Sequence, residues 1–319
     1  MQIGFKLAAE AFDPNELVRQ AVRAEAVGFD FVEMSDHFHP WLDNQNHSPF
    51  AWTVLGTIAA RTERIGLATG VTCPMIRYHP AIIAQAAATT ALLSDGRFTL
   101  GIGSGERLNE HIVGGDFPPV RVRHRMLREA LEIIRLLWRG GYRSYDGRYL
   151  SLSDARVFDL PETPPEIAVA AGGPRAAELA AELGDGLFAT EPKPELVRAY
   201  RQAGGDGPRY LEVGVAFADD ERAGAQAALS TNRWSVGGWK VMSELPNPAN
   251  FAAATTTVRV DDMLDAMVCG SDPKPYVDAV RDAVEAGYDR VVLMNAGPDM
   301  DAFLDFYQGE LNDLLRAEV

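Results

Sequence analysis

The amino-acid sequence predicts a parallel (β/α)8 barrel, a TIM barrel with insertion segments, that occupies residues 1–319 as one domain. Two observations predict this fold class. Strand-like and helix-like segments alternate along nearly the whole chain, and eight strand-like segments are each followed by a helical one. No Gly/Ser-rich or Pro-rich linker divides the chain. A doubly wound open sheet is the alternative, but the eighth strand comes too late in the chain for two similar halves.

The strand-like segments are short apolar runs bounded by residues that favour turns. We expect strands at residues 3–7, 31–34, 65–69, 98–102, 167–170, 187–189, 211–217 and 291–294. The helical segments place apolar side chains at helical spacing, as Leu17, Val18 and Val22 do in the first. We expect helices at residues 14–27, 50–61, 81–93, 123–138, 194–202, 261–268, 274–286 and 302–315, and one directly after Gly173. Residues 141–152 are typical of a hairpin. Residues 219–259 form an insertion that could cover the barrel mouth as a lid or only pack on the surface.

Composition and charge argue against several classes of partner. A chain of 319 residues, 47% of them hydrophobic, has enough apolar side chains for a large core. Its net charge of −15 argues against binding to nucleic acid. No apolar run reaches the roughly 18 residues that span a membrane, and no leader precedes the first strand, so we expect a cytoplasmic protein. Cys73 and Cys269 lie in apolar surroundings, which predicts buried thiols rather than a disulfide or a metal site.

The most informative segment follows the second expected strand, where Asp36, His37 and Trp41 stand close together. Barrels of this class place their chemistry on loops at the carboxyl ends of the strands. A histidine transfers protons near neutral pH, a neighbouring carboxylate can orient it, and an indole can wall off a ring-shaped ligand. The alternative is an ordinary turn in which Asp36 caps a helix.

Three further segments follow other strands. Gly101, Gly103 and Gly105 resemble a dinucleotide fingerprint, but Glu106 stands where its third Gly belongs, so a Rossmann site is not predicted and Glu106 is a candidate acid or a solvated loop carboxylate. Gly172 and Gly173 precede a helix, where backbone N–H groups can bind an anion, although a tight strand–helix turn would look the same. Lys193 follows the sixth strand and could hold a substrate anion, but a lone lysine is more often a solvated surface charge.

Together these segments resemble the coenzyme F420-dependent glucose-6-phosphate dehydrogenase-like family of the bacterial luciferase-like superfamily. The resemblance covers nearly the whole chain. The motifs that carry it are Ser35-Asp-His-Phe-His-Pro-Trp41, Arg77-Tyr-His-Pro-Ala-Ile-Ile-Ala-Gln85, Gly103-Ser-Gly-Glu-Arg-Leu-Asn109, Ala170-Ala-Gly-Gly-Pro174 and Gly184-Asp-Gly-Leu-Phe188. It implies an (α/β)8 barrel, a homodimer, and the deazaflavin coenzyme F420 bound at the carboxyl ends of the strands.

The resemblance also implies roles for individual residues. His37 would be the base that takes the proton of the substrate hydroxyl, Trp41 would hold the substrate, and Glu106 would act as an acid. The residues implied in cofactor binding are Asp36, Gly70, Val71, Gly105, Asn109, Gly172 and Gly173, with a non-proline cis peptide at Gly70–Val71. Thr190 and Lys193 would bind the substrate, and no metal is implied.

The implied activity is hydride transfer from a sugar or sugar-phosphate hydroxyl carbon to the deazaflavin. Two cations with which the family binds a sugar phosphate fall near Ala253 and Ala266 here, and Lys240 or Arg259 could replace them. Another sugar phosphate, a free sugar or a simple alcohol therefore remain open. Alternatives are an F420-dependent alcohol dehydrogenase, an F420H2-dependent reductase, an FMN-dependent monooxygenase, and a cofactor carrier without enzymatic activity.

Overall fold

The computed structural model describes residues 1–319, and eight parallel strands in it close into a barrel. Around the barrel they are β1 (Gln2–Leu7), β2 (Phe31–Met34), β3 (Gly66–Thr69), β4 (Phe98–Ile102), β7 (Glu166–Ala170), β8 (Gly186–Ala189), β9 (Arg209–Ala216) and β11 (Arg290–Asn295). Pairing of β8 with β9 and of β11 with β1 leaves no open edge among them. The predicted (β/α)8 fold is confirmed.

Helices surround this barrel, and most of them have the predicted bounds to within three residues. They are α1 (Pro14–Val27), α2 (Ala51–Arg61), α3 (Pro80–Leu93), α5 (Val120–Trp138), α6 (Pro174–Leu183), α7 (Pro194–Gln202), α8 (Glu221–Asn232), α11 (Val260–Ala266) and α12 (Pro273–Glu285). α1 illustrates the local cause: the Asp13 side chain accepts hydrogen bonds from the amides of Asn15 and Glu16, and Gly28 ends the helix at φ 98°.

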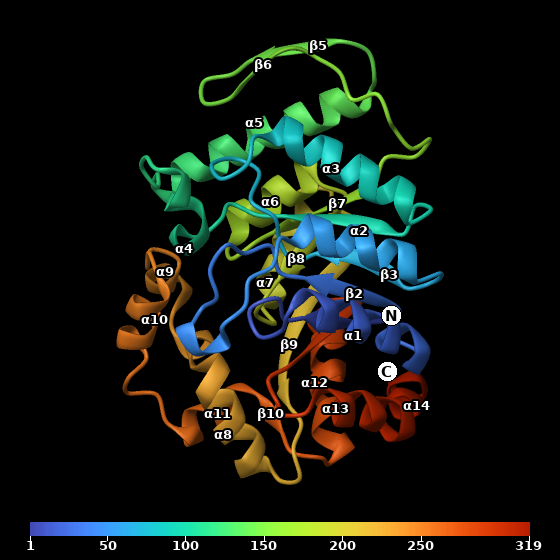
Figure 1. Ribbon diagram of the computed structural model, residues 1–319, viewed down its shortest axis with the longest axis vertical. Helices are drawn as coiled ribbons and strands as arrows, with labels where there is room; N and C mark the ends of the chain where they lie inside the picture. Colours follow the sequence, from blue (N-terminus) through green and yellow to red (C-terminus); the bar gives the residue numbers. More distant parts are fainter.

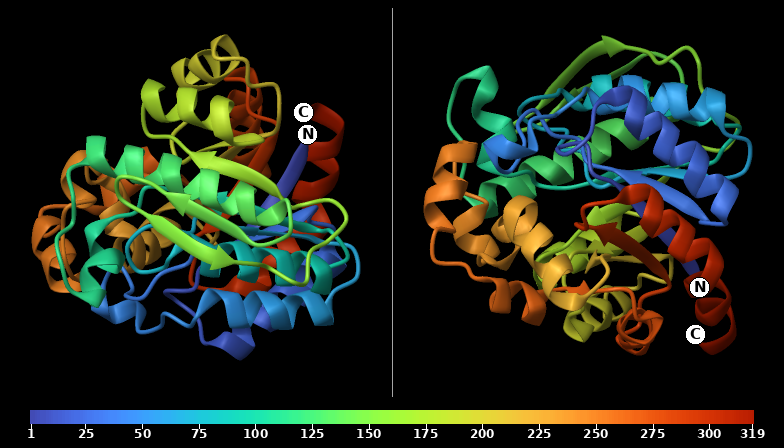
Figure 2. Two further views of the ribbon diagram at one scale, coloured as in Figure 1. Left: turned by 90° about the horizontal axis from the view of Figure 1, so that it is seen from above. Right: turned by 60° about the horizontal axis from the view of Figure 1, so that its bottom comes forward.

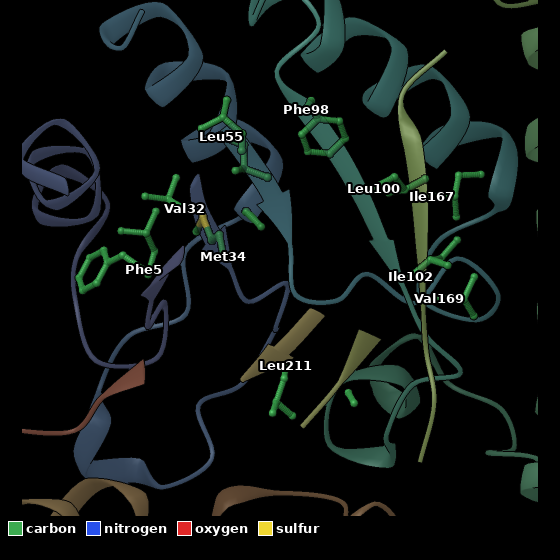
Figure 3. Packing of buried hydrophobic residues seen from close by; sticks show 14 of the residues in the cluster. Phe5, Val32, Met34, Leu55, Phe98, Leu100, Ile102, Ile167, Val169 and Leu211 are labelled. Atoms are coloured by element: carbon green, nitrogen blue, oxygen red, sulfur yellow. The ribbon is translucent and has the colours of Figure 1, made fainter. Parts of the chain in front are cut away.

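Alternation along the strands divides the buried side chains into two sets. One set faces the helices and forms the main core, where Phe5, Val32 and Met34 pack beside Leu55 of α2 (Figure 3). The other set points into the barrel. Phe31, Ala168, Phe188, Tyr210 and Val292 form one interior layer there.

The carboxyl-terminal third departs most from the sequence prediction. Residues 219–259 contain α8, a 3-10 turn at Arg233–Val236, α9 (Trp239–Met242) and α10 (Pro248–Ala254). α8 packs with α11 and a short extra strand, β10 (Val268–Cys269), which lies beside β9. The predicted helix at 261–268 is therefore wrong at its end. α8 escaped prediction because it buries mainly alanines and glycine, which give a weak apolar pattern.

Two further segments complete the chain. The predicted hairpin is β5 (Arg143–Asp146) with β6 (Ser151–Ala155), and it lies outside α5 at the top of Figure 1. The predicted helix at 302–315 is three consecutive pieces, α13 (Met300–Phe306), a π-helical turn (Tyr307–Leu311) and α14 (Asn312–Glu318).

Both predicted buried thiols, Cys73 and Cys269, are free and buried. None of the helices is long and apolar enough to span a membrane.

The two ends of the barrel differ in what covers them. Both chain termini lie at one end, whereas α4 (Arg107–Glu110), α9 and α10 gather at the opposite one (Figures 1 and 2). The loops that leave the carboxyl ends of β2 and β4 contact these short helices: the amide of Arg107 donates to the carbonyl of Ser243, directly after α9. The mouth of the barrel is therefore bordered by residues 233–259.

Candidate active site

Two neighbouring strands bring a carboxylate and an imidazole together at the barrel mouth. β1 and β2 are parallel, and Leu7 pairs with Met34 at their carboxyl ends. Glu10 lies three residues beyond Leu7, and His37 lies three residues beyond Met34. Equal offsets from a paired position place the two side chains at the same height above the barrel, and their contact follows from that register.

His37 lies between two carboxylates. Its Nδ1 is 2.5 Å from Oε1 of Glu10, and its Nε2 is 3.8 Å from Oε1 of Glu106. Because a carboxylate only accepts, this contact favours the tautomer with the proton on Nδ1, which leaves Nε2 as the atom that can exchange one. Burial lowers the pKa of His37, but the charge and hydrogen bond of Glu10, with a smaller contribution from Glu106, raise it above the usual histidine value. Burial raises the pKa of Glu10, and His37 more than reverses that effect.

Glu106 is held in place by Asn109. The Asn109 amide donates to Oε1 of Glu106 at 2.6 Å, and its Oδ1 accepts from the backbone amides of Phe38 at 2.7 Å and His39 at 2.9 Å. Asn109 is fully buried. Its polar atoms thus join the loop that carries His37 to the loop that carries Glu106, and its predicted contact with a cofactor stays a prediction.

Asp36 is the centre of a second buried network. It accepts from the hydroxyl of Thr72 at 2.7 Å, from Arg77 at 3.0 Å and from the hydroxyl of Tyr78 at 3.1 Å. The Arg77 guanidinium also donates to the backbone carbonyl of Asp36 at 2.5 Å. These bonds fix the backbone next to His37. The side chain of Asp36 is fully buried, so its predicted contact with a cofactor also stays a prediction.

Gly105 allows the loop after β4 to turn tightly beneath Glu106. It has φ +72°, and an ideal Cβ there would lie 2.7 Å from Sγ of Cys73 and 2.9 Å from Cγ of Glu110. Only glycine fits that position without displacing its neighbours. Glu110 is itself buried, and burial raises the pKa of its carboxyl to about 7, even though the Arg77 amide donates to it.

Trp41 forms an aromatic wall beside His37. The two rings meet edge to face, with centroids 4.8 Å apart. Trp234, from the segment after α8, stacks on Trp41, with ring centroids 4.2 Å apart and an interplanar angle of 16°. Trp239 of α9 and Phe251 of α10 meet the same indole at 6.2 Å and 5.2 Å. We call these four aromatic residues, Trp41, Trp234, Trp239 and Phe251, the aromatic wall.

Below the mouth, a buried ionic cluster crosses the barrel interior. Nζ of Lys6 on β1 lies 2.5 Å from Oε1 of Glu33 on β2 and 2.5 Å from Oε1 of Glu212 on β9. Nζ also donates to the carbonyl of Gly70 at 2.9 Å. Burial lowers the pKa of Lys6, but the two carboxylates more than reverse this, and burial raises the pKa of Glu33. The cluster supports the segment after β3 from beneath.

The segment above this cluster is Gly70–Val71, and its peptide bond is cis, as the resemblance implies. Two glycines of β4 and its loop let the segment approach closely. An ideal Cβ on Gly101 would lie 1.8 Å from the carbonyl oxygen of Thr69, and one on Gly103 would lie 2.7 Å from Cγ2 of Val71. Val71 is half-buried and packs, like Ala170, against the interior layer that contains Phe188. It offers an apolar surface to a flat ligand.

The start of α6 fits an anionic group. The amides of Gly172, Gly173 and Arg175 have no hydrogen-bond partner within the chain. They precede a helix of ten residues, whose dipole favours negative charge at this end. No atom lies within 4 Å of an ideal Cβ on Gly173, so the approach is open.

Two predicted substrate residues lie on the rim. Thr190 is exposed, directly after β8. Lys193 precedes α7, and its Nζ is 2.6 Å from Oε2 of Glu191. The cation that the sequence offered for a substrate anion thus already has a carboxylate partner.

The structure brings His37, Trp41 and Glu106 together, with Asp36 and Asn109 behind them. Sequence reasoning missed Glu10, Thr72, Arg77 and Tyr78 as site residues, and also the wall residues of the insertion. Glu10 had a usable signal, because it is an acid just beyond the first strand, next to the strand that carries His37.

Comparison with known proteins matches residues 1–290 to the family described as luciferase-like monooxygenase. The F420-dependent glucose-6-phosphate dehydrogenase of Kribbella flavida is 37% identical over 337 residues, which cover 99% of this chain and 98% of that protein. The enzyme of the same name from Kineococcus radiotolerans is 37% identical over 331 residues, covering 99% and 97%. The solved structure of an F420-dependent secondary alcohol dehydrogenase in complex with an F420-acetone adduct is 28% identical, has a TM-score of 0.92 and covers 99% of both chains.

Proposed function

We propose that this chain is an F420-dependent dehydrogenase. It belongs to the luciferase-like monooxygenase family, and it is similar over nearly its whole length to F420-dependent glucose-6-phosphate dehydrogenases. The reaction would oxidise the C–OH group of a small molecule. The observation that carries the proposal is the pairing of His37 with Glu10 at the mouth of the barrel, with Nε2 of His37 left to face the reacting group. Binding alone would not require an oriented base.

The residues of this chain fit coenzyme F420. Val71 would support one face of its flat ring, and the free amides of Gly172, Gly173 and Arg175 would bind a phosphate of its tail. When bound, the deazaflavin supplies the hydride acceptor. Asp36 and Asn109 would act from behind, by fixing the loops that carry His37 and Glu106.

His37 would accept the hydroxyl proton at Nε2 while the carbon of the substrate loses its hydride. Glu10 holds the ring in the orientation and tautomer that this step needs, and it stabilises the cation that forms. Glu106, at 3.8 Å, adds negative charge on the other side of the ring. Trp41 would exclude water and position the substrate beside the imidazole.

The direction of the reaction depends on the protonation state of His37. Its raised pKa means that the neutral form, which oxidation needs, increases as the pH rises through that value. The protonated form, which reduction needs, dominates below it. The same site would therefore serve an F420H2-dependent reductase at lower pH. A sugar phosphate and a secondary alcohol are the candidate substrates that the relatives' names offer.

The test is to compare the wild type with His37→Ala. We expect turnover, followed as loss of F420 absorbance and fluorescence, to fall by a factor of about 10² to 10⁴, the usual contribution of a general base. The dissociation constant for F420 should change less than about three-fold, because the proposed cofactor contacts are elsewhere. Equal turnover in both proteins would contradict the role of His37. Tight F420 binding without turnover in either direction would indicate a carrier, and oxygen-dependent turnover with reduced FMN would indicate a monooxygenase.

We also propose that the enzyme is a homodimer that pairs through the outer faces of α2 and α3. Phe50, Ile82 and Leu93 are more than half exposed there, and Leu92 is 42% exposed. α3 is apolar on all sides, which is typical of a helix covered on both faces. Light scattering should give twice the chain mass of 34.7 kDa, and Ile82→Asp/Leu93→Asp should give the monomer mass. A monomer in the wild type would contradict the proposal.

A cytoplasmic location and the absence of nucleic-acid and membrane partners stay predictions.

A further inference from the structure

The backbone on both sides of His37 is held by hydrogen bonds from other parts of the chain. The carbonyl of His37 accepts from the hydroxyl of Ser48 at 3.0 Å, and the amide that follows donates to Oδ1 of Asn109 at 2.7 Å. On the preceding side, the carbonyl of Asp36 accepts from Nη2 of Arg77 at 2.5 Å. This carbonyl belongs to the planar peptide unit that leads into His37, so a shift of Arg77 is transmitted directly to the base.

Arg77 is buried, so its charge must be compensated within the protein. Its side chain is only 6% exposed. Nη2 also donates to the carboxylate of Asp36 at 3.0 Å, and Nη1 donates to the hydroxyl of Tyr78 at 3.0 Å. The third nitrogen, Nε, is buried without a hydrogen-bond partner. A buried guanidinium is stable only where opposite charge and hydrogen bonds surround it, so the group that faces Nε matters for the position of Arg77.

The group that faces Nε of Arg77 is the carboxylate of Glu110. Its Oε1 is 3.7 Å from Nε, and its Oε2 accepts from the backbone amide of Arg77 at 2.9 Å. The Glu110 side chain is only 1% exposed, so little water screens this attraction. Asp36 thus binds one terminal nitrogen of the guanidinium and Glu110 faces Nε. The two carboxylates together determine where the guanidinium lies.

Glu110 belongs to α4, the short helix that also organises the other side of His37. Glu106, directly before α4, faces Nε2 of His37, and Asn109 binds the amide that follows His37. Positions three and four residues apart lie on one face of a helix, so these two side chains and that of Glu110 share a face. One helical turn therefore contacts the loop of the base directly and also binds Arg77, which holds the same loop from the other side.

We propose that Glu110 is a positioning residue for the base. Its carboxylate holds Arg77 against the carbonyl of Asp36. Arg77 in turn keeps the imidazole of His37 in contact with Glu10, so that Nε2 stays aimed at the mouth. The effect on turnover rests on the proposed dehydrogenase function, whereas the positioning itself can be measured without cofactor or substrate.

The chain offers a matched control in Glu129, a carboxylate that only supports the fold. Glu129 is half-buried on α5 and accepts from the backbone amides of Arg148 at 3.0 Å and of Tyr149 and Leu150 at 2.9 Å. These amides belong to the hairpin of β5 and β6, which lies outside α5 and away from the barrel mouth (Figure 1). Glu129→Gln should therefore affect stability without affecting His37.

The first measurement is the exchange of the Nδ1 proton of His37 with solvent, followed by NMR in the F420-free protein with isotope-labelled histidine and assigned with His37→Gln. Glu110→Gln keeps an oxygen that accepts from the Arg77 amide but removes the charge that faces Nε. We expect it to speed this exchange about ten-fold, because the ring leaves Glu10 more often. Glu129→Gln should stay within about two-fold of the wild type.

The pH of this measurement follows from the surroundings of Glu110. Burial raises the pKa of its carboxyl to about 7, and the titratable groups that face it are Arg77, Glu106 and Cys73. At about pH 8.5 the wild-type carboxylate is therefore ionised, and Glu110→Gln removes a full charge. An unchanged exchange rate in Glu110→Gln, or a wild-type proton that exchanges too fast to detect, would overturn the proposal.

The second measurement is kcat for F420 reduction with glucose 6-phosphate and with 2-propanol. It should fall about ten-fold in Glu110→Gln and about 100-fold in Arg77→Lys, whose point charge cannot hold the carbonyl and the carboxylate of Asp36 together, while KM changes less than about three-fold. In His37→Ala, where no base is left to position, adding Glu110→Gln should cause no further loss. Losses that multiply would show that Glu110 does not act through His37, which overturns the proposal. Faster proton exchange in Glu110→Gln without turnover in the wild type would support the positioning and contradict the dehydrogenase function.

Discussion

Two ionic clusters in this barrel have the same arrangement of charges but differ in whether the central nitrogen can exchange its proton. In the interior, Lys6 lies between Glu33 and Glu212, and at the mouth His37 lies between Glu10 and Glu106. Each has one nitrogen base between two carboxylates. The interior cluster is closed, with Lys6 only 5% exposed, and its carboxylates raise an already high pKa, so the ammonium keeps its proton. At the mouth an imidazole takes that place, and the carboxylates beside it raise its pKa above the usual histidine value.

The comparison distinguishes a cluster whose charges stabilise the fold from a cluster whose charges prepare a side chain for proton transfer. Lys6 bonds to the carbonyl of Gly70 and supports the floor of the site. His37 exposes Nε2 at the mouth, where a substrate can reach it. The same electrostatic arrangement therefore fixes a backbone in one place and prepares a base in the other, and the choice of lysine or histidine decides which.

The largest expected effect comes from breaking the interior cluster. Lys6→Met leaves the buried carboxylate of Glu33 and the partly buried carboxylate of Glu212 without a cation, and we expect it to reduce the free energy of unfolding by about 3–5 kcal/mol. Urea unfolding followed by tryptophan fluorescence measures this. Lys6→Met/Glu33→Gln/Glu212→Gln removes the uncompensated charge and should recover most of the loss.

His37→Gln is the matched change at the mouth. It should cost less stability than Lys6→Met, because the glutamine amide can still donate a hydrogen bond to a neighbouring carboxylate, whereas methionine cannot. Its main effect should be on turnover.

If Lys6→Met were as stable as the wild type, the interior carboxylates would have to be protonated already, and the cluster would not be ionic.

The sequence predicts the parts of this comparison unequally. Phe31–Met34, Pro14–Val27 and Pro194–Gln202 have the bounds that their patterns predict, because short apolar runs and Pro at the first helical turn are local signals. His37 and Glu106 could be identified because they follow strands that are easy to recognise. The interior cluster could not, since Lys6 and Glu33 look like ordinary strand residues until the register pairs them across β1 and β2.

Site residues outside the barrel strands were harder to predict. Trp234 and Phe251 reach Trp41 through folding of residues 233–259, which have no regular apolar period. Asn109 shows another limit. Its position beside Glu106 is visible in the sequence, but its use of both amide atoms to join two loops depends on tertiary contacts.

A smaller effect is expected from Glu10→Gln, which removes the charge that most raises the pKa of His37. The neutral form of His37 then appears at lower pH, so the rise of kcat/KM for F420 reduction with pH should move to lower pH. The plateau should fall roughly ten- to hundred-fold, less than the loss of the base itself, because an amide orients the ring less firmly. A pH profile of F420 reduction measures both. An unchanged profile would mean that Glu10 does not control the proton of His37.

Glu106→Gln is the matched control and should have the smallest effect. The amide oxygen of the substituted side chain can still accept from Asn109, so the loop keeps its position, and only the charge at 3.8 Å from Nε2 is lost. The pH profile should move in the same direction as for Glu10→Gln, because Glu106 also raises the pKa of His37, but by less, since its charge is farther from the ring. A larger shift for Glu106→Gln than for Glu10→Gln would reverse the assignment, making Glu106 the main partner of the imidazole and Glu10 the secondary one.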